Sequence, residues 1–219
     1  MSNAVCSIVG AGPGVGQAVA RRFALAGFQI ALVARRPAVL EQQATELQAS
    51  GATAQTFPAD ATDPAALQAA FQQIHAQMGA PAVLVYNAAV IRDGMPSDTA
   101  YENLINDFRV NVAGALVCVQ AVLPTMREQQ RGTILFTGGG LALDPYAQYA
   151  SLAIGKAGLR SLTYTLGAEL EPQGIHVATV TIAGTVQPGT FFAPDLIAEQ
   201  YWNLHTQAPG TWQREIVYR

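Results

Sequence analysis

The sequence is poor in charge, with only 12% charged residues in 219, a formal net charge of −3 and no basic block. Nucleic acids and anionic membrane surfaces are bound by clustered Lys and Arg, so we expect neither as a partner. No apolar run approaches the roughly 18 residues that span a bilayer. No charged leader with a cleavage site precedes the first apolar segment. We therefore expect no membrane span, no signal peptide and a cytoplasmic location.

Cysteine and histidine are also scarce, with two and three residues respectively. Cys6 and Cys118 lie in apolar segments, which predicts buried free thiols rather than a disulfide or a metal pair. The histidines lie far apart and lack the spacing of metal ligands, so no metal site is expected. His176 opens a strand and is expected to be structural. His205 lies near the end of a helix, where we expect a favourable interaction between its positive charge and the helix dipole.

Half of the residues are hydrophobic, which is enough for one sizeable domain with a core. Short apolar runs alternate with longer amphipathic patterns. Strands are expected at 5–9, 29–34, 53–58, 82–86, 132–136, 176–182 and 215–218. Helices are expected from Val15 onward, at 37–50, at 64–78, at about 99–127 with a break near Gly114, from around Lys156 to about 170, and at 195–207.

The stretch 5–16, Val-Cys-Ser-Ile-Val-Gly-Ala-Gly-Pro-Gly-Val-Gly, is the most informative part of the chain. Gly10, Gly12, Gly14 and Gly16 stand between an apolar strand pattern and a helical pattern. Glycines let the backbone turn tightly and let a pyrophosphate approach, and the start of a helix favours negative charge. A plain tight turn is the alternative, but the strand–glycine–helix context, with a second strand following, favours a dinucleotide site.

The spacing of Gly10, Gly14 and Gly16 resembles the Gly-x-x-x-Gly-x-Gly motif of the short-chain dehydrogenase/reductase (SDR) family. A second matching segment is Ala-Ile-Gly-Lys-Ala-Gly-Leu-Arg-Ser-Leu, which contains Lys156. The resemblance covers residues 5–218, nearly the whole chain.

This resemblance implies a single NAD(P)-binding Rossmann domain over residues 1–219, with a short C-terminal substrate region at about 187–219. The expected fold is α/β and three-layered, with a doubly wound parallel sheet of about seven strands. Ligands are then expected at the carboxyl ends of the first and fourth strands, the topological switch point.

The charges after the second expected strand predict the choice of cofactor. Arg35 and Arg36 follow that strand, and no Asp or Glu lies between Phe28 and Leu40. In a Rossmann unit an acidic residue near this point binds the ribose hydroxyls, whereas an Arg accommodates a 2′-phosphate. The resemblance also places Arg35 where NADP-preferring members often carry a basic residue. We predict NADP(H) as the cofactor, with a pair of solvated loop arginines as the alternative.

The resemblance implies further cofactor contacts. Asp60 would hydrogen-bond the adenine amine with Ala61 beside the ring, although Asp60 also fits a plain turn residue. Asn87 would brace the sheet, Ala88 would face the adenosine ribose, and the Val186 backbone would bind the carboxamide. The full predicted cofactor-binding set is Gly10, Gly12, Gly14, Val15, Gly16, Arg35, Arg36, Asp60, Ala61, Asn87, Ala88, Lys156, Gly184 and Val186.

Members of the family carry a catalytic Ser after the fifth strand and a Tyr-x-x-x-Lys motif on the next helix. The Lys lowers the Tyr pKa and holds the nicotinamide ribose, while Tyr and Ser serve the substrate oxygen. Lys156 matches this pattern. Asn111 resembles the family's helix Asn that holds a water in the proton relay, or is a plain polar residue at a helix irregularity. Leu152 and Gly139 stand at the Tyr and Ser positions, and neither can donate a side-chain proton.

Nearby hydroxyls are candidates to replace the missing groups. Tyr149 is expected one helical turn before Leu152. There it is either a surrogate acid that replaces the family's Tyr, or a lid residue whose ring is packed and whose hydroxyl faces solvent. Thr137 or Ser151 would polarise the substrate oxygen. The predicted catalytic set is therefore Lys156, Asn111 and, as the surrogate acid, Tyr149.

Two functions follow from these residues. The first is an NADP(H)-dependent oxidoreductase that acts on a small carbonyl or alcohol by an atypical mechanism, and we favour it. The second is an NADP-binding protein without dehydrogenase turnover, acting as a sensor, a scaffold or a partner subunit. A Rossmann lyase or epimerase has no supporting residue.

By family analogy we expect a homodimer or homotetramer through the helices at 99–127 and around Lys156. The apolar stripes of these helices fit burial in the core equally well.

Overall fold

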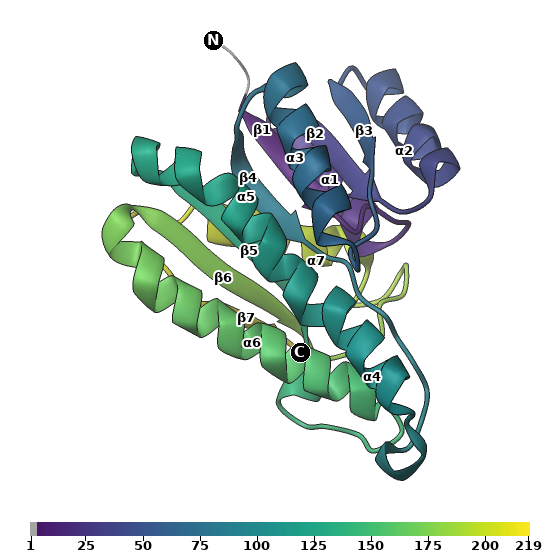
Figure 1. Ribbon diagram of the computed structural model, residues 1–219. Coiled ribbons are helices and arrows are strands. Elements are labelled where there is room, and N and C mark those ends of the chain that lie inside the picture. Colours follow the sequence, from purple (N-terminus) through teal and green to yellow (C-terminus); the bar gives the residue numbers. More distant parts are fainter. Residues whose placement is uncertain (1–3) are drawn as a thin grey trace.

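The computed structural model describes residues 4–219, which build a seven-stranded sheet with helices on both faces (Figure 1). Every strand pairs in parallel with its neighbours, in the order β3-β2-β1-β4-β5-β6-β7. The second and third strands are thus added on one side of β1 and the last four on its other side, so the strand order reverses between β1 and β4. The strands are β1 Val5–Val9, β2 Gln29–Ala34, β3 Ala54–Pro58, β4 Pro81–Tyr86, β5 Gly132–Gly139, β6 Ile175–Ile182 and β7 Glu215–Tyr218.

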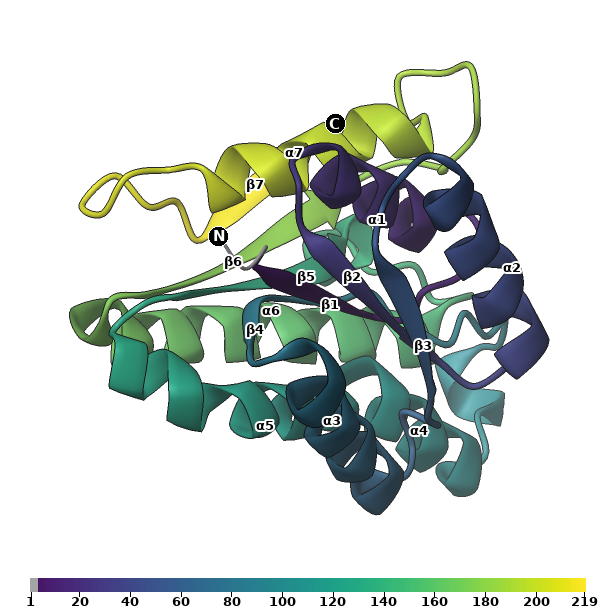
Figure 2. The same cartoon turned by 90° about the horizontal axis from the view of Figure 1, so that it is seen from above.

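Two helical layers enclose the sheet, as the view from above shows (Figure 2). Helices α1, α2 and α7 cover one face, and α3, α5 and α6 cover the other. The helices are α1 Val15–Leu25, α2 Pro37–Ala49, α3 Pro64–Met78, α4 Tyr101–Phe108, α5 Gly114–Gln129, α6 Ala150–Leu170 and α7 Pro194–His205. Short turns are η1 Pro96–Asp98, η2 Arg109–Ala113, η3 Gly140–Ala142 and η4 Glu171–Gln173. The predicted three-layer, doubly wound α/β fold with a parallel sheet is confirmed.

The alternation of side chains along β1 explains why the strand has no solvent-facing side. All five of its residues are buried, with Val5 and Val9 in the core beneath α3, α5 and α6. Cys6 and Ile8 point into the opposite core beneath α1, α2 and α7. A strand covered on both faces has a nearly continuous apolar sequence. The one polar residue of β1, Ser7, donates its hydroxyl proton to the Val83 carbonyl at 3.2 Å. Cys6 and Cys118 are both buried free thiols, as predicted.

The segment predicted as one helix at 99–127 consists of α4, a π-helical turn and α5. The π-helical turn η2 ends directly before Gly114, close to the predicted break. Tyr86, at the end of β4, donates its hydroxyl proton to the Val110 carbonyl at 2.5 Å. A Cβ atom on Gly114 would lie 2.6 Å from both the Ala61 carbonyl oxygen and the Tyr86 hydroxyl. Glycine is therefore required where the helix packs on the sheet.

The expectation that no segment is long and apolar enough to span a bilayer is wrong. The helical segment Tyr101–Gln129 contains an 18-residue window of mean hydropathy 1.4, long and apolar enough by length and composition to cross a membrane. Half of that window is buried inside the fold, where α5 packs against α3, β4 and β5. Its apolar character is explained by this burial, as for a core helix of an α/β sheet.

The interpretation of His205 as a charged group at a helix end is also wrong. Its ring packs against Phe23 and Trp202 with centroid distances of 5.4 Å, and its Nδ1 atom lies 3.0 Å from the Thr133 hydroxyl. Burial lowers the pKa of His205 to about 4, so the ring is neutral at pH 7. A neutral imidazole cannot interact as a cation with the helix dipole, and His205 instead helps to seat α7 against α1.

The close approach at Gly114 gives a stability prediction. In Gly114→Ala the added methyl group meets the Ala61 carbonyl and the Tyr86 hydroxyl, which outweighs the better helix propensity of Ala. We expect the free energy of unfolding, measured in urea, to fall by about 1–2 kcal/mol. Gly94→Ala is the matched control, because its Cβ would meet only the Thr99 hydroxyl at 3.8 Å. Equal stability of the two variants would contradict this packing argument.

Candidate functional site

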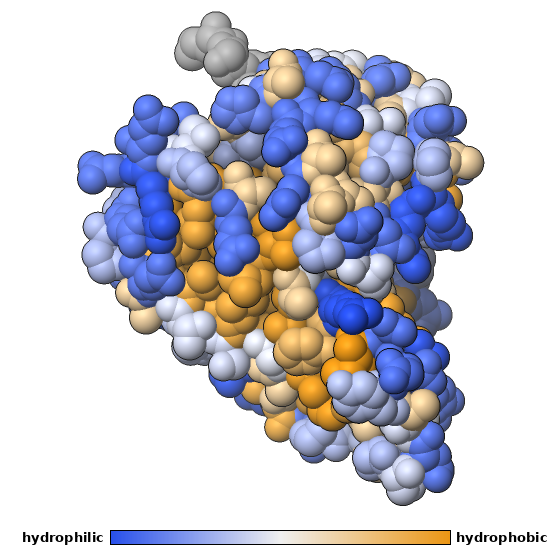
Figure 3. Space-filling view, viewed as in Figure 1, coloured by the Kyte–Doolittle hydropathy of each residue, from blue (hydrophilic) through white to orange (hydrophobic). Residues whose placement is uncertain are grey.

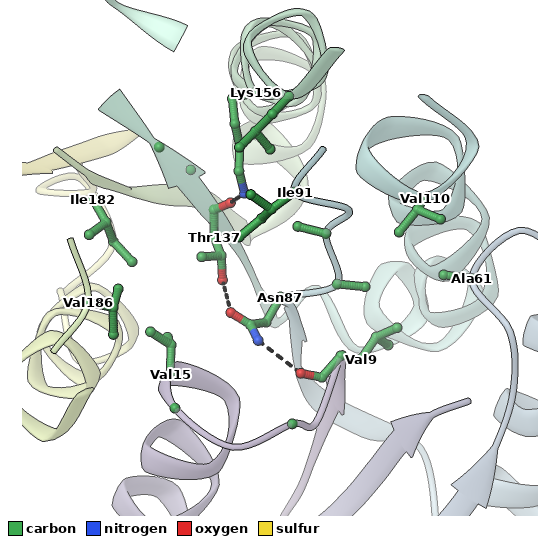
Figure 4. Close-up of a pocket in the computed structure, with 18 of the residues that line it drawn as sticks. Val9, Val15, Ala61, Asn87, Ile91, Val110, Thr137, Lys156, Ile182 and Val186 are labelled. Carbon is green, nitrogen blue, oxygen red and sulfur yellow. Dashed lines mark hydrogen bonds between the residues drawn. The ribbon is translucent and has the colours of Figure 1, made fainter. Parts of the chain in front are cut away.

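A cleft of about 1040 Å³ opens over the carboxyl ends of the central strands (Figure 4). Its walls come from the segments 9–15, 34–36, 87–91, 137–141 and 182–186, together with the start of α6. Because all strands are parallel, the loops after β1, β2, β4, β5 and β6 leave the sheet at one edge. The cleft therefore lies at the switch point where a ligand site is expected, between the ends of β1 and β4.

The turn between β1 and α1 has the geometry of an anion cradle. Gly10 has φ +83°, and a Cβ there would lie 2.3 Å from the Ala88 backbone nitrogen, so only glycine fits. Gly14 has φ +99° and open space where a side chain would stand. Within residues 4–219, the Val15 and Gly16 N–H groups at the start of α1 donate to no backbone carbonyl. A phosphate group fits such unpaired donors at a helix start.

Two arginines and an aspartate lie at the end of the cleft nearest β2 and β3. The Arg35 guanidinium is 4.0 Å from the Asp60 carboxylate, and the two side chains are 65% and 42% exposed. Burial alone would raise the pKa of Asp60, but hydrogen bonds from the Thr62 N–H and hydroxyl, both 2.8 Å, and the Arg35 charge hold it below its usual value. A solvated pair at this distance binds weakly, so Arg35 remains available to an anionic ligand.

A chain of hydrogen bonds crosses the floor of the cleft. The Asn87 amide donates to the Gly10 carbonyl at 2.9 Å, and the Thr137 hydroxyl donates to the Asn87 side-chain oxygen at 2.8 Å (Figure 4). The Thr137 oxygen is also 2.7 Å from the Tyr201 hydroxyl. Thr137 has one proton, which goes to Asn87, so Tyr201 must be the donor in the second bond. The Thr137 hydroxyl is therefore occupied and is not a replacement for the family's catalytic Ser.

Lys156 is the only lysine in the sequence and reaches the cleft from the second turn of α6. Its Nζ atom donates to the Thr137 carbonyl oxygen at 2.6 Å, the upper dashed line of Figure 4. The side chain is buried, and the loss of solvation lowers its pKa to about 8. At pH 7 the cleft thus contains a buried cation beside the end of β5.

The start of α6 differs in one respect from the prediction. The helix begins at Ala150, so Tyr149 is its N-cap residue rather than a residue within the helix. A β-bridge joins Tyr149 to Gly94, and its half-buried side chain lines the cleft with Leu152. Gly139 lies alongside Lys156, where a Cβ would be 3.4 Å from the lysine chain, an ordinary contact. Neither Gly139 nor Leu152 offers a proton donor to the cleft.

Two predicted site residues lie outside the cleft lining. Gly16 packs beneath the glycine turn, and a Cβ there would be 2.6 Å from the Gly10 carbonyl oxygen. Asn111 is buried in η2, where its side chain accepts from the Val90 N–H at 2.8 Å and donates to the Val90 carbonyl at 3.3 Å. Both residues shape the loops that line the cleft. Within residues 4–219, no group of His, Cys, Asp or Glu side chains is placed to hold a metal ion.

The sequence analysis did not find one buried network beside the cleft. Asp107 of α4 is 1% exposed and accepts two hydrogen bonds from Arg92, at 2.8 and 3.0 Å. The Ser151 hydroxyl donates to the same carboxylate at 2.7 Å, so Ser151 is not available to a substrate. The network ties the loop after β4 to α4 and to the first turn of α6. Its members are far apart in sequence, and no local pattern relates them.

Comparison with known proteins places this geometry in a family. The profile of the short chain dehydrogenases matches residues 4–192. The chain belongs to the short-chain dehydrogenase family. Membership confirms the resemblance predicted from the glycine spacing and the segment around Lys156, and it makes the chain an SDR oxidoreductase-family protein.

Individual relatives span most of this SDR chain. It is 34% identical to 2,3-dihydro-2,3-dihydroxybenzoate dehydrogenase of Bacillus subtilis over 83% of this chain and 69% of that protein. It is 33% identical to the inactive 2-(S)-hydroxypropyl-CoM dehydrogenase 2 of Xanthobacter autotrophicus, over 81% and 74% respectively.

Solved structures show the same fold. A short-chain dehydrogenase from Rhodopseudomonas palustris has a TM-score of 0.90 at 25% identity, with 99% of this chain and 98% of that chain covered. A metagenomic short-chain oxidoreductase in complex with NADP also has a TM-score of 0.90, at 28% identity, with 99% and 97% covered.

The buried Lys156 gives a prediction about pH. Its ordinary pKa of 10.5 falls to about 8 in the folded protein, so the charged form is penalised by folding. Replacement in Lys156→Met removes that penalty of about 3 kcal/mol and loses one hydrogen bond of about 1 kcal/mol. We expect the variant to be more stable than the native protein at pH 7 by about 2 kcal/mol, measured by urea unfolding.

The sign of the pH dependence is fixed by which state holds the proton. Between pH 8 and 10.5 the unfolded chain keeps the Lys156 proton that the folded chain has lost, so native stability rises with pH relative to the variant. The advantage of the Met variant should therefore shrink by about 2–3 kcal/mol between pH 8 and pH 10. A constant difference between the two proteins across this range would contradict the lowered pKa of Lys156.

Proposed function

We propose that this SDR protein binds NADP(H) in the cleft and interconverts a small carbonyl compound and the corresponding alcohol. One observation carries the proposal. The glycine cradle at the start of α1 continues into an open wall with Arg35 and Arg36 and a single carboxylate, Asp60. An Arg at this position suits a 2′-phosphate, whereas an acidic residue would repel it. The SDR structure that contains NADP adds support.

Each part of the cofactor has matching groups in this proposal. The unpaired N–H group of Val15, at the start of α1, would hold the pyrophosphate, and Arg35 the 2′-phosphate. Asp60 would accept from the adenine amine. The cleft segment 182–186, with Gly184 and Val186, would hold the nicotinamide carboxamide, and Lys156 its ribose. When bound, the reduced nicotinamide supplies a hydride to the carbonyl carbon.

The atypical element of the proposal is the source of the proton. With Gly139 and Leu152 on the cleft wall, we assign the proton on the substrate oxygen to Tyr149, directly or through a water. The Tyr149 hydroxyl has no hydrogen-bond partner within residues 4–219, so its proton is available. The charge of Lys156 would stabilise the negative charge that develops on the oxygen. Asn111 would act by positioning the loop at Val90.

A second function is favoured by one observation, the lack of donors at Gly139 and Leu152. In that case the chain would bind NADP without dehydrogenase turnover, as a sensor, a scaffold or a partner subunit. One relative, the CoM dehydrogenase 2 of Xanthobacter autotrophicus, is itself named as inactive. The nucleotide half of the cleft would serve either function equally.

We infer a homodimer or homotetramer through the outer face of α5 and α6. Apolar side chains gather over these helices in Figure 3. Leu116 of α5 is 37% exposed and Ile154 of α6 is 47% exposed. A contiguous apolar face of this kind is typical of a protein–protein interface.

The cofactor assignment predicts a selective effect of Arg35→Gln. The variant loses a charge-assisted hydrogen bond to the 2′-phosphate, so we expect NADPH affinity to fall about 10- to 100-fold. NADH affinity should change by less than about threefold, because NADH has no such phosphate. Both are measured by the fluorescence of the bound reduced nicotinamide. Arg131→Gln, an exposed arginine outside the cleft, is the control. Tighter binding of NADH than of NADPH by the native protein would overturn the assignment.

A double variant separates the two functions. Gly139→Ser with Leu152→Tyr supplies the missing donors, and the contact at Gly139 leaves room for the new Cβ. We expect kcat/KM for simple aldehydes to rise by about 100-fold or more, the usual contribution of a positioned acid. Turnover that is present only in the double variant would establish the second function for the native chain.

The role of Tyr149 is tested in the native background. Tyr149→Phe removes the hydroxyl and keeps the ring, so the shape of the cleft is retained. If Tyr149 is the acid, turnover falls by about 100-fold with NADPH affinity unchanged. Full retention of turnover would remove Tyr149 from the mechanism.

A further inference from the structure

The cleft has two ends of opposite charge. At the end near β2 and β3, the side chains of Arg35 and Arg36 outnumber the single carboxylate of Asp60. The other end of the cleft lies beyond Lys156 and is formed by the segment after β5 and the start of α6. Within residues 4–219, no Arg and no other Lys lines this end. The charged residue there is Asp144. A ligand that fills the cleft therefore meets cations at one end and an anion at the other.

The walls around Asp144 are apolar and aromatic. They are formed by Ile91, Leu141, Tyr146 and Leu152, with Tyr149 at the start of α6. Ile91 and Tyr146 are 75% and 58% exposed, so their side chains offer surface to a ligand rather than to the core. Aliphatic and aromatic side chains of this kind favour a substrate with a ring or another broad apolar body.

Backbone bonds fix the position of Asp144. The N–H groups of Leu143 and Asp144 both donate to the Gly140 carbonyl at 2.9 Å, directly after the end of β5. The Asp144 side chain is exposed and has no ion-pair partner within residues 4–219. The negative charge of Asp144 thus lines this end of the cleft without a paired positive charge.

Arg92 and Lys156 already have hydrogen-bond partners within the protein. Arg92, on the loop after β4, is turned to the buried carboxylate of Asp107 with two hydrogen bonds. The Nζ atom of Lys156 is buried and donates to the Thr137 carbonyl. An anionic group on the distal part of a substrate would therefore find Asp144 and no cation to pair with it. Specificity against such a substrate arises from this repulsion.

We propose that the substrate is a ring-bearing carbonyl compound or alcohol whose distal part is cationic or uncharged, and that Asp144 selects it against anionic analogues. The proposal rests on the proposed function for the reacting group, but the charge selection depends only on the walls of the cleft. Asp144 acts on the distal substituent, so it determines specificity and takes no part in proton transfer. A quaternary ammonium group suits both the carboxylate and the tyrosine rings.

A matched series of probes tests this selection. Benzyl alcohols substituted at the para position with trimethylammonio, tert-butyl or carboxylate groups differ in charge, and the first two are isosteric. Binding of each is measured by calorimetry with and without NADPH, with which an alcohol forms a non-reacting complex. The corresponding benzaldehydes give kcat/KM with NADPH where turnover occurs.

We expect the cationic probe to bind about fivefold more tightly than the tert-butyl probe, as for unit charges several ångströms apart near water. The carboxylate probe should bind about fivefold more weakly than the tert-butyl probe. Asp144→Asn should bring both ratios close to one. Glu128→Gln changes the net charge equally at an exposed position outside the cleft and should leave both ratios unchanged.

The outcomes separate this proposal from the proposed function. Equal or tighter binding of the carboxylate probe overturns the proposal, as do ratios that Asp144→Asn does not change. NADPH binding without binding of any probe also overturns it while leaving the cofactor assignment intact. If NADPH fails to bind but the probes still show the Asp144-dependent ratios, the oxidoreductase function is wrong and the charge selection stands.

Discussion

The hydrogen-bond chain from Gly10 through Asn87 and Thr137 to Tyr201 is the constraint on which the cleft depends. It links the ends of β1, β4 and β5 to α7, and Lys156 of α6 adds a fifth element by donating to the Thr137 backbone. Each member is buried or half-buried, so a missing partner would leave a polar group unsatisfied away from water. These bonds connect the elements at the carboxyl edge of the sheet from which the cleft loops leave.

The same arrangement places a cation where solvation is poor. Burial of Lys156 costs folding free energy, and its hydrogen bond to the Thr137 carbonyl offsets only part of that cost. Such a lowered pKa in a cleft is typical of a functional group rather than of a structural one. Arg35 and Arg36 line one end of the cleft and Asp144 lines the other. In the proposed function this difference in charge would orient a bound dinucleotide and its substrate.

Local sequence signals were sufficient for most of the fold. The apolar run of β1, the glycine turn and the helical periodicities predicted every strand to within a few residues, because each depends on neighbours along the chain. Tyr149 and His205 were misread because a helix start and a buried ring depend on distant partners, Gly94 and Thr133. The Arg92–Asp107–Ser151 network was missed for the same reason, since its members meet only in the folded chain.

A single lysine makes the central claim directly testable. Protein labelled with ¹³C at lysine Cε gives one side-chain signal, from Lys156, which is followed by NMR while NADPH is added. The account predicts that this signal shifts and saturates at the nucleotide concentration at which reduced-nicotinamide fluorescence saturates. A Lys156 signal that stays unchanged at saturating NADPH would contradict the account, because the nucleotide would then lie outside the cleft or stop short of the lysine.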